Sequence, residues 1–364
     1  MNNLTNEAKL NQMTLLAQYR NELYKKPRLV NLFFELTDAC NMSCLHCGSC
    51  ASPKNKRFLD TGLIKKVLDE VASEYNPYEI LVCFSGGEPL LHPDIYDLIE
   101  YTAKKGFFCG ITTNGTLINE VNAKKLKDAG LRSVSISIDG TREMHDWFRN
   151  QSGAFDRAMQ GVKSLVNIGG IYTQITTVIH KKTIDSLDDI YSEVVKSGAH
   201  SWRPIGIDPI GRALDHEELL LDGVDYKKLF GYITKMRESN GDIIEVTYGC
   251  SHYLGVPYEK EVRDFYYICS AGIMNASILC NGDIYGCMDI ERRDELIQGN
   301  IKNDSFVDVW KSKFQIYRQN KAYLCADCSR CDDKELCCGE AYHTWNYDKN
   351  EPMICVKNLL KETK

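Results

Sequence analysis

Three cysteines near the N-terminus carry the clearest chemical signal in this sequence. Cys40, Cys44 and Cys47 are spaced C-x3-C-x2-C and directly follow an apolar run. Four thiolates are the usual ligands of a [4Fe–4S] cluster, so a cluster held by these three would keep one iron open to an outside ligand. Structural zinc is the alternative, but zinc sites favour a short cysteine pair with a second pair downstream. The spacing therefore favours an iron–sulfur cluster.

Further polar motifs follow apolar segments along the chain. Gly86, Gly87 and Glu88 lie in Ser-Gly-Gly-Glu-Pro, where glycines allow close approach of the backbone and the carboxylate can accept bonds from an ammonium group. Asn114 and Asp139 each precede a glycine, in turn sequences that tolerate positive φ. A plain Gly-Gly turn is the alternative for the first motif. The motif lacks the spacing and the lysine of a phosphate loop, so nucleoside triphosphate binding is not expected.

The segments before these motifs alternate between strand and helix patterns. Residues 61–75 predict a helix, because their apolar side chains recur on one face. Apolar runs predict strands near residues 29–36, 79–84, 107–112, 133–138, 172–178 and 201–207. This alternation predicts an α/β fold built of parallel βαβ units. In barrels of such units chemistry collects at the C-terminal strand ends, which is where the motifs lie.

The triplet and the motifs that follow the strands together resemble the radical S-adenosylmethionine (SAM) superfamily. The resemblance implies a partial (β/α)6 barrel, SAM bound to the open iron, and reductive cleavage of SAM to a 5′-deoxyadenosyl radical. His46 stands where that family usually has an aromatic residue. The residues that the resemblance assigns to SAM binding are Gly86, Gly87, Glu88, Asn114, Ser137, Asp139, Arg149 and Ile205.

A second set of cysteines lies in the C-terminal third of the chain. Cys269 and Cys287 are spaced C-x12-G-x4-C. The block that follows contains Cys325, Cys328, Cys331, Cys337, Cys338 and Cys355. This pattern resembles the SPASM domain, a small cysteine-rich extension, and implies two auxiliary [4Fe–4S] clusters. A zinc-ribbon-like tail is the alternative, because Cys-x2-Cys pairs also suit zinc.

The resemblance divides these cysteines between an outer and an inner auxiliary cluster. The outer ligands it assigns are Cys328, Cys331, Cys337 and Cys355. The inner ligands are Cys250, Cys269 and Cys287, but Ala341 occupies the position of a further expected cysteine. The alternatives for the missing inner ligand are Cys280, Cys325, Cys338 and His343, or an open iron that binds substrate. Cys325 is counted among the predicted metal ligands.

Composition excludes several classes of protein. The 364 residues carry a net charge of −6, which argues against a nucleic-acid or anionic-membrane partner. The sequence shows no signal peptide and no apolar run of membrane-spanning length. The sixteen cysteines are therefore expected in the reducing cytoplasm, where metal ligation is commoner than disulfide formation. The predicted organisation is an N-terminal extension (1–28), a radical SAM core (29–213), a bridging segment (214–248) and an auxiliary-cluster domain (249–364).

The resemblance implies an enzyme that abstracts hydrogen from a peptide or protein, and a ribosomally made peptide is the expected substrate. Crosslinking, oxidation and epimerisation are the expected outcomes. An oxidase or decarboxylase of a small molecule is one alternative, and a non-catalytic electron-transfer protein is another. Only about 28 residues precede the first predicted strand, so leader recognition is expected to use a separate protein or the catalytic domains. A flavodoxin- or ferredoxin-like protein is the expected reductant.

A few side chains are candidates for direct reaction. Cys50 follows the triplet closely and is a candidate hydrogen donor to a substrate radical. Cys83 and Cys109 are further donor candidates, although a free cysteine in a strand usually packs as a small hydrophobe. Asp289, two residues after Cys287, is a candidate base beside the inner cluster. Histidines expected to be ordinary surface or core residues are His180, His216 and His252.

Overall fold

The computed structural model describes residues 4–239 and 241–362. Its strands are β1 (Asn31–Glu35), β2 (Leu81–Ser85), β3 (Phe108–Thr113), β4 (Ser133–Ser137), β5 (Tyr172–Ile179), β6 (Ser201–Gly206), β7 (Glu245–Val246), β8 (Asn275–Ile278), β9 (Asp283–Tyr285), β10 (Gly299–Asn300), β11 (Trp345–Asn346) and β12 (Glu351–Pro352). Its α-helices are α1 (Asn6–Lys25), α2 (Thr61–Glu74), α3 (Ile95–Lys104), α4 (Glu120–Asp128), α5 (Arg142–Phe148), α6 (Ala154–Ile168), α7 (Leu187–Ser197), α8 (Gly223–Ser239), α9 (Phe306–Ser312), α10 (Ala326–Ser329), α11 (Lys334–Cys337) and α12 (Val356–Glu362).

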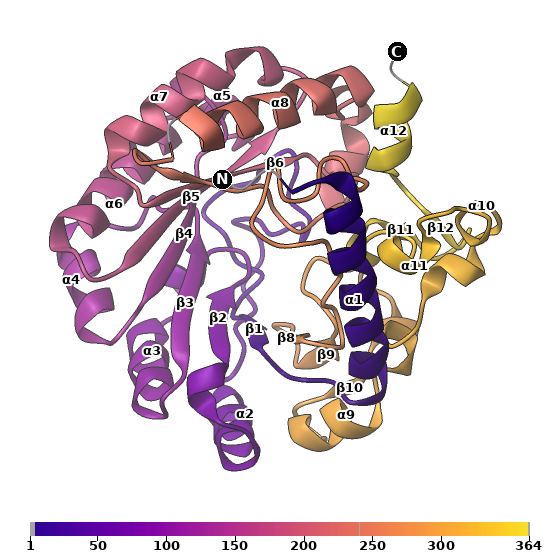
Figure 1. The fold of residues 1–364 in the computed structure, drawn as a ribbon. Coiled ribbons are helices and arrows are strands. Elements are labelled where there is room, and N and C mark those ends of the chain that lie inside the picture. Colours follow the sequence, from indigo (N-terminus) through magenta and orange to yellow (C-terminus); the bar gives the residue numbers. More distant parts are fainter. Residues whose placement is uncertain (1–3, 240, 363–364) are drawn as a thin grey trace.

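The six strands predicted from the apolar runs form the centre of one curved sheet. The strand order is β10-β9-β8-β1-β2-β3-β4-β5-β6-β7, and neighbouring strands from β1 to β6 are parallel. Figure 1 shows α2, α3, α4, α6 and α7 along the outer side of this sheet. The predicted α/β class and the partial barrel of βαβ units are thereby confirmed.

The sheet extends beyond the six predicted strands at both edges. Strand β7 pairs parallel with β6, and β8 pairs parallel with β1 in a register that places Phe33 beside Ser277. Strand β8 belongs to the cysteine-rich C-terminal part of the chain. The auxiliary-cluster region is therefore joined edge to edge with the strand that precedes the cysteine triplet. The domain boundaries at 213 and 248 remain a prediction.

Helix α2 illustrates how the sequence pattern produces the packing. The Asp60 side chain accepts a hydrogen bond from the Leu63 backbone N–H (2.9 Å) and caps the first turn. The inward face buries Ile64, Val67, Leu68 and Val71 against the sheet. Each such side chain contributes about 1.5–3 kcal/mol of hydrophobic stabilisation when it is removed from water. The predicted helix over residues 61–75 is confirmed, with its last residue at Glu74.

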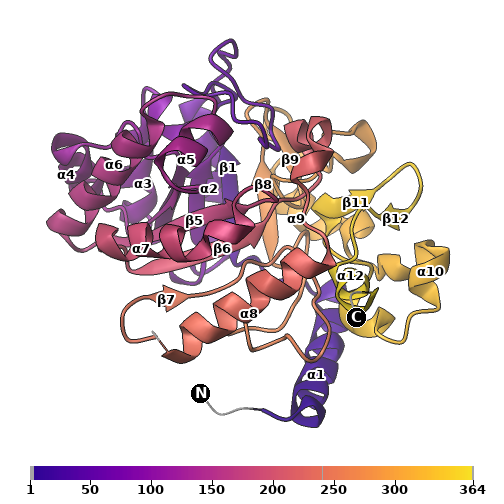
Figure 2. The same cartoon turned by 90° about the horizontal axis from the view of Figure 1, so that it is seen from above.

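The N-terminal helix α1 packs on the C-terminal part of the chain rather than on the barrel (Figures 1 and 2). Arg20 donates from Nη1 to the carbonyl oxygen of Leu336 (3.0 Å). The Tyr24 hydroxyl donates to the sulfur of Cys338 (3.7 Å). The predicted N-terminal extension is thus an integral support of the cysteine-rich region. In the described part of the chain, no helix is long and apolar enough to cross a membrane.

Candidate active site

The cysteine triplet lies in the loop after β1, and one arginine from the segment after β6 holds that loop. Cys40 and Cys44 are buried, and Cys47 is half-buried. Arg212 donates from Nε to the carbonyl oxygen of Cys44 (2.6 Å) and from Nη1 to that of Ala51 (3.1 Å). Its backbone N–H donates to the carbonyl oxygen of Cys47 (3.1 Å). No sequence motif indicated this role of Arg212.

A cavity of about 200 Å³ opens beside the triplet, at the C-terminal ends of β2 to β5. We call it the cofactor cavity. Its wall contains all three cysteines of the triplet. Five of the residues predicted to bind SAM also line it, namely Gly86, Gly87, Asn114, Ser137 and Arg149. Thr112, which belongs to the turn motif that contains Asn114, lines it as well. Val178 and Arg212 also line it and were not anticipated, because neither lies in a recognisable motif.

The Gly-Gly turn is needed for a close approach of two backbone segments. Gly86 has φ +122°, and a Cβ on it would lie 2.5 Å from the carbonyl oxygen of Thr37. A Cβ on Gly87 would lie 2.1 Å from the carbonyl oxygen of Ala39, the residue before Cys40. The glycines therefore bring the turn against the start of the cysteine loop, in addition to lining the cofactor cavity.

Glu88 lies behind the cofactor cavity and is not part of its wall. Its Oε1 accepts hydrogen bonds from the Thr113 hydroxyl (2.7 Å) and the Leu90 N–H (3.1 Å). Its Oε2 accepts one from the Asn114 N–H (2.9 Å). Complete burial raises the pKa of Glu88, and these donors oppose that shift. Glu88 thus ties the ends of β2 and β3 together, and its predicted contact with SAM remains a prediction.

Arg149 and Asp139 form a buried ion pair beside the triplet. Arg149 donates from Nε to Asp139 Oδ2 (2.5 Å) and from Nη1 to the sulfur of Cys44 (3.6 Å). Asp139 Oδ1 accepts from the Val178 N–H (2.9 Å). Burial raises the pKa of the Asp139 carboxyl, and Arg149 counteracts it. The pair fixes a guanidinium next to Cys44, where its positive charge favours the thiolate.

The side chains around the cofactor cavity suit a cluster with a polar molecule beside it. Burial raises the pKa of the Cys40 thiol to about 12, so its thiolate form needs a positive charge such as that of bound iron. The His46 ring stacks on Phe148 at 4.0 Å. The buried Nδ1 of His46 has no hydrogen-bond partner in the described part of the chain, and a bound polar group would supply one.

No three His, Cys, Asp or Glu side chains among residues 4–239 and 241–362 are arranged to hold a single metal ion. A cube of four irons differs from a single ion, because each thiolate binds a separate iron atom. The ligands of a cluster therefore need not converge on one point. The three cysteines in the wall of the cofactor cavity therefore fit a cluster rather than a single ion.

A larger cavity of about 390 Å³ adjoins the cofactor cavity, and we call it the central cavity. His46 and Ser85 line both cavities. On its other side the central cavity reaches Cys250, Cys269 and Cys287, the predicted ligands of the inner auxiliary cluster. The folded chain thus places one open space between two predicted cluster sites that are more than 200 residues apart in sequence.

The wall of the central cavity contains three charged side chains, those of Arg203, Asp208 and Asp289, and one predicted SAM contact. Asp289, the candidate base, lines it and accepts a hydrogen bond from the sulfur of Cys287 (3.9 Å). Arg203 also lines it, and its Nε donates to the Thr176 hydroxyl (3.3 Å). Ile205 lines this cavity and not the cofactor cavity. The cavity therefore offers a substrate both charged and apolar contacts.

The predicted outer ligands are brought together by the fold. Cys355, which follows the others by some twenty residues, lies close enough to Cys328, Cys331 and Cys337 for electrostatic interaction. The N–H of Cys328 also donates to the sulfur of Cys325 (3.4 Å). Five predicted ligands thus gather in one region, of which the outer cluster needs four.

Hydrogen-bond donors surround these outer cysteines. The Lys357 ammonium group lies 3.3 Å from the sulfur of Cys331 and 2.5 Å from Asp333. The Glu340 N–H donates to the sulfur of Cys337 (3.2 Å). Donors of this kind stabilise thiolates and adjust the potential of a bound cluster.

Three candidate donors of hydrogen differ in their placement. Cys50 is exposed, has φ +54°, and lines neither cavity. Cys83 is buried with its sulfur 3.8 Å from the Thr112 hydroxyl, and Cys109 is completely buried. The structure therefore does not bring these thiols into the cavity walls.

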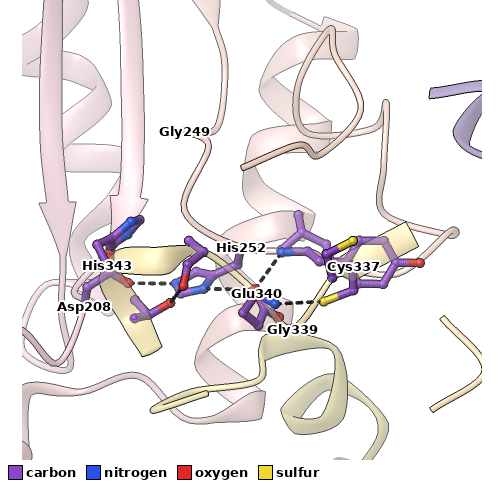
Figure 3. Close-up of polar contacts among 12 residues, drawn as sticks. Asp208, Gly249, His252, Cys337, Gly339, Glu340 and His343 are labelled. Carbon is purple, nitrogen blue, oxygen red and sulfur yellow. Dashed lines mark hydrogen bonds and ion pairs between the residues drawn. The ribbon is translucent and has the colours of Figure 1, made fainter. Parts of the chain in front are cut away.

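A chain of buried polar side chains leads away from the central cavity (Figure 3). His343 and Asp208 both line the cavity, and Nε2 of His343 lies 3.3 Å from Oδ2 of Asp208. Oδ1 of Asp208 lies 2.8 Å from Nε2 of His252. Nδ1 of His252 lies 3.7 Å from Oε2 of Glu340, whose N–H contacts Cys337. His252 is thus a core histidine, as expected, but it is paired with two carboxylates.

The two carboxylates determine the charge of His252. Burial alone would lower the pKa of its ring, but Asp208 and Glu340 raise it to about 9. Burial alone would likewise raise the pKa of Asp208, and the histidines on both sides hold it well below its usual range. Asp208 is therefore an ionised carboxylate inside the protein.

Two family models match the two parts of the chain. Residues 34–194 match the radical SAM superfamily, and residues 269–332 match SPASM, an iron–sulfur cluster-binding domain. The chain therefore belongs to the radical SAM enzymes that carry a C-terminal SPASM domain. A radical SAM domain binds SAM and a [4Fe–4S] cluster, and a SPASM domain binds auxiliary iron–sulfur clusters.

Particular relatives cover most of the chain. An AdoMet-dependent heme synthase of Nitratidesulfovibrio vulgaris is 28% identical over 86% of this chain and 87% of its own length. The mycofactocin maturase MftC of Mycolicibacterium smegmatis is 28% identical over 84% of this chain and 80% of its own. The solved structure of native anSMEcpe with bound AdoMet and a Cp18Cys peptide superposes with a TM-score of 0.73, 20% identity, and coverage of 92% and 95%. At 20% identity, this likeness shows that the two chains share a fold.

Proposed function

We propose that this enzyme holds its catalytic cluster on Cys40, Cys44 and Cys47 and abstracts hydrogen from a peptide bound in the central cavity. The cluster, together with SAM, supplies the 5′-deoxyadenosyl radical. The observation that carries the proposal is the position of the central cavity, which shares wall residues with the cofactor cavity and reaches the inner auxiliary cysteines. A substrate there lies between the place where a radical is made and a one-electron acceptor.

The residues of the cofactor cavity bind and orient SAM. Asn114, Ser137 and Arg149 present the polar groups that its amino acid and ribose parts need. Asp139 holds Arg149 in place through the buried ion pair. Glu88 keeps the ends of β2 and β3 in register, so that Asn114 faces the cavity. Fixed geometry of this kind is what directs a reactive radical to one substrate atom.

The residues of the central cavity hold the substrate. Asp289 is placed to accept a proton when the substrate is oxidised. Arg203 makes no ion pair with any described residue, so its guanidinium is available to a carboxylate or carbonyl group of the substrate. Ile205 supplies apolar contact. Cys250, Cys269 and Cys287 would hold an auxiliary cluster, which would supply a one-electron acceptor beside the substrate.

A peptide is the substrate class that we favour. The central cavity of about 390 Å³ lies near the lower end of the size range of small-molecule sites, which suits one or two amino-acid side chains better than a four-ring macrocycle. A relative that is similar to this chain over most of its length, MftC of M. smegmatis, is a mycofactocin maturase. A separate leader-binding protein, a flavodoxin- or ferredoxin-like reductant and a cytoplasmic location belong to this proposal.

A tetrapyrrole is the second candidate substrate. It is favoured by the heme synthase of N. vulgaris, whose identity to this chain equals that of the maturase. Oxidative decarboxylation of a propionate releases carbon dioxide, whereas oxidation of a peptide releases two hydrogens. The two reactions therefore differ in product mass.

The test is anaerobic incubation of the reconstituted enzyme with SAM and dithionite in D₂O. One sample contains any short peptide encoded beside this gene, and a second contains iron coproporphyrin III. Mass spectrometry follows each substrate and the release of 5′-deoxyadenosine. The control is Cys44→Ala, which removes one ligand of the catalytic cluster and should abolish deoxyadenosine formation.

Each outcome has a definite meaning. A peptide that loses two hydrogens indicates crosslinking or oxidation, and deuterium uptake alone indicates epimerisation. An unmodified peptide together with a decarboxylated porphyrin would replace the peptide by the tetrapyrrole. Absence of deoxyadenosine from the wild-type enzyme with its clusters loaded would overturn the assignment of the triplet.

A further inference from the structure

The inner auxiliary site is one ligand short of a complete protein set. Cys250, Cys269 and Cys287 line the central cavity, and so does Ala341, which stands at the place of the expected fourth cysteine. An iron without a fourth thiolate must bind another group. The identity of that group does not depend on the substrate and rests only on the auxiliary cluster of the SPASM domain.

The fold separates the four candidates for this position. The Cys280 N–H donates to Glu35 (3.2 Å) and Cys338 accepts a bond from Tyr24 (3.7 Å), while Cys325 lies beside Cys328 in the outer group. None of these three cysteines lines the central cavity. His343 does line it, two residues beyond Ala341.

His343 has the hydrogen bonding of a metal-ligating histidine. Its Nε2 lies 3.3 Å from Oδ2 of Asp208, so the Nε2–H tautomer donates a hydrogen bond to this carboxylate oxygen. In that tautomer the lone pair of the ring is on Nδ1, and the hydrogen bond that His343 makes among the described residues is through Nε2. A carboxylate behind the ring is the usual partner of a ligating histidine, because it fixes the tautomer and the orientation.

Asp208 is itself held firmly. Its side chain is only 11% exposed, and its second oxygen lies 2.8 Å from Nε2 of His252, which is completely buried. His252 is in turn placed between Asp208 and the buried Glu340 (Figure 3). The ring of His343 is therefore oriented by a network in the protein interior rather than by a mobile surface loop.

We propose that His343 is the fourth ligand of the inner auxiliary cluster, through Nδ1, and that Asp208 is its positioning residue. Replacement of thiolate by histidine raises the reduction potential of an iron–sulfur cluster. The inner cluster then accepts an electron from a substrate more readily than one ligated only by cysteine.

The experiment uses the full chain with Cys40, Cys44 and Cys47 replaced by alanine, so that the reduced auxiliary clusters are the only paramagnetic centres. The protein is labelled with ¹⁵N-histidine, reconstituted anaerobically, reduced and examined by pulsed electron paramagnetic resonance. His343→Gln and His343→Cys are compared with His216→Gln, a matched control at a surface histidine that pairs only with Glu218. The midpoint potential and the iron content of each variant are measured as well.

We expect strong nitrogen hyperfine coupling in the parent and in His216→Gln, and its loss in His343→Gln. His343→Cys should keep the full iron content, lose the coupling and show a lower midpoint potential. If His343→Gln fails to assemble the inner cluster, His343→Cys decides between ligation and a structural role. Absence of the coupling from the parent, its persistence in His343→Cys, or failure of His343→Cys to load the cluster would overturn the proposal.

Discussion

A methyl group at Gly87 tests how the Gly-Gly turn is packed against the cysteine loop. A Cβ added to Gly87 would lie 2.1 Å from the carbonyl oxygen of Ala39 and 3.1 Å from the Cβ of Ala51. The first neighbour is a backbone atom, so it cannot turn aside as a flexible side chain can. The segment that leads into Cys40 must therefore move. We expect Gly87→Ala to lose the catalytic cluster while the rest of the fold persists.

The magnitude follows from the overlap. Adding a methylene to a close-packed interior costs about 1–3 kcal/mol, and a backbone contact this short places Gly87→Ala at the upper end, about 3 kcal/mol. Gly231, inside α8, is a matched control, because no atom lies within 4 Å of a Cβ built there. Alanine in a helix interior is about 0.5–1 kcal/mol more favourable than glycine. The same Gly→Ala change is therefore expected to lower stability at Gly87 and to raise it at Gly231.

The assay is anaerobic urea unfolding of the two variants, combined with iron analysis and deoxyadenosine formation. Gly87→Ala should lower the unfolding midpoint and reduce the iron content by the equivalent of one cluster. Gly231→Ala should raise the midpoint slightly and keep all activity. Equal midpoints and equal iron content in the two variants would refute the reasoning about this contact.

Three further predictions concern buried polar groups. Glu88→Gln should lower the free energy of unfolding by about 1–3 kcal/mol, because the NH₂ group of the glutamine must face N–H and O–H donors that now bond to the carboxylate. An unchanged urea midpoint would contradict this. Arg149→Met should lower the free energy of unfolding by about 3–5 kcal/mol, because it leaves Asp139 buried without its partner. Adding Asp139→Asn should recover part of that loss. A double variant no more stable than the single one would argue against the ion pair as the cause. Burial lowers the pKa of His180 to about 4, whereas in the unfolded chain the imidazole has its ordinary pKa of about 6.5. Between these two pH values the unfolded chain binds the proton and the folded chain does not. The free energy of unfolding should therefore fall as the pH decreases from about 6.5 to about 4. His180→Gln should flatten the pH dependence of the urea midpoint over that range, whereas the control His216→Gln, at a half-buried histidine, should not. Equal pH slopes in the two variants would count against the effect.

Much of the fold could be read from the chain because the pattern is local. The apolar runs gave β1 to β6 and the amphipathic period gave α2, since both reflect which side chains face the core. Strands β7 to β10 were missed because each has two to four residues, too few for a period. The packing of α1 on the C-terminal region was missed because its partners, such as Leu336, lie more than 300 residues away in sequence.

The candidate site likewise contains residues that the sequence could indicate and residues that only the fold could reveal. Ligand spacing in a short loop is a local property, so Cys40, Cys44 and Cys47 are evident from the sequence, as are the glycines of the turn. Arg212 was missed because a clamp on two carbonyl oxygens leaves no motif. The position of Glu88 behind the cavity wall also required the fold, because burial depends on the neighbouring strand.

The sequence by itself determined the chemical class of this protein, because cluster ligation depends on residue type and short-range spacing, and both are written in the chain. Only the tertiary structure decided what these groups do together. The edge pairing of β8 with β1 brings the auxiliary cysteines beside the catalytic loop, and it thereby creates the central cavity between them. The same long-range packing places Asp208 within hydrogen-bonding distance of His343. Contacts between residues more than 100 positions apart depend on how the whole core closes, and no local pattern records them.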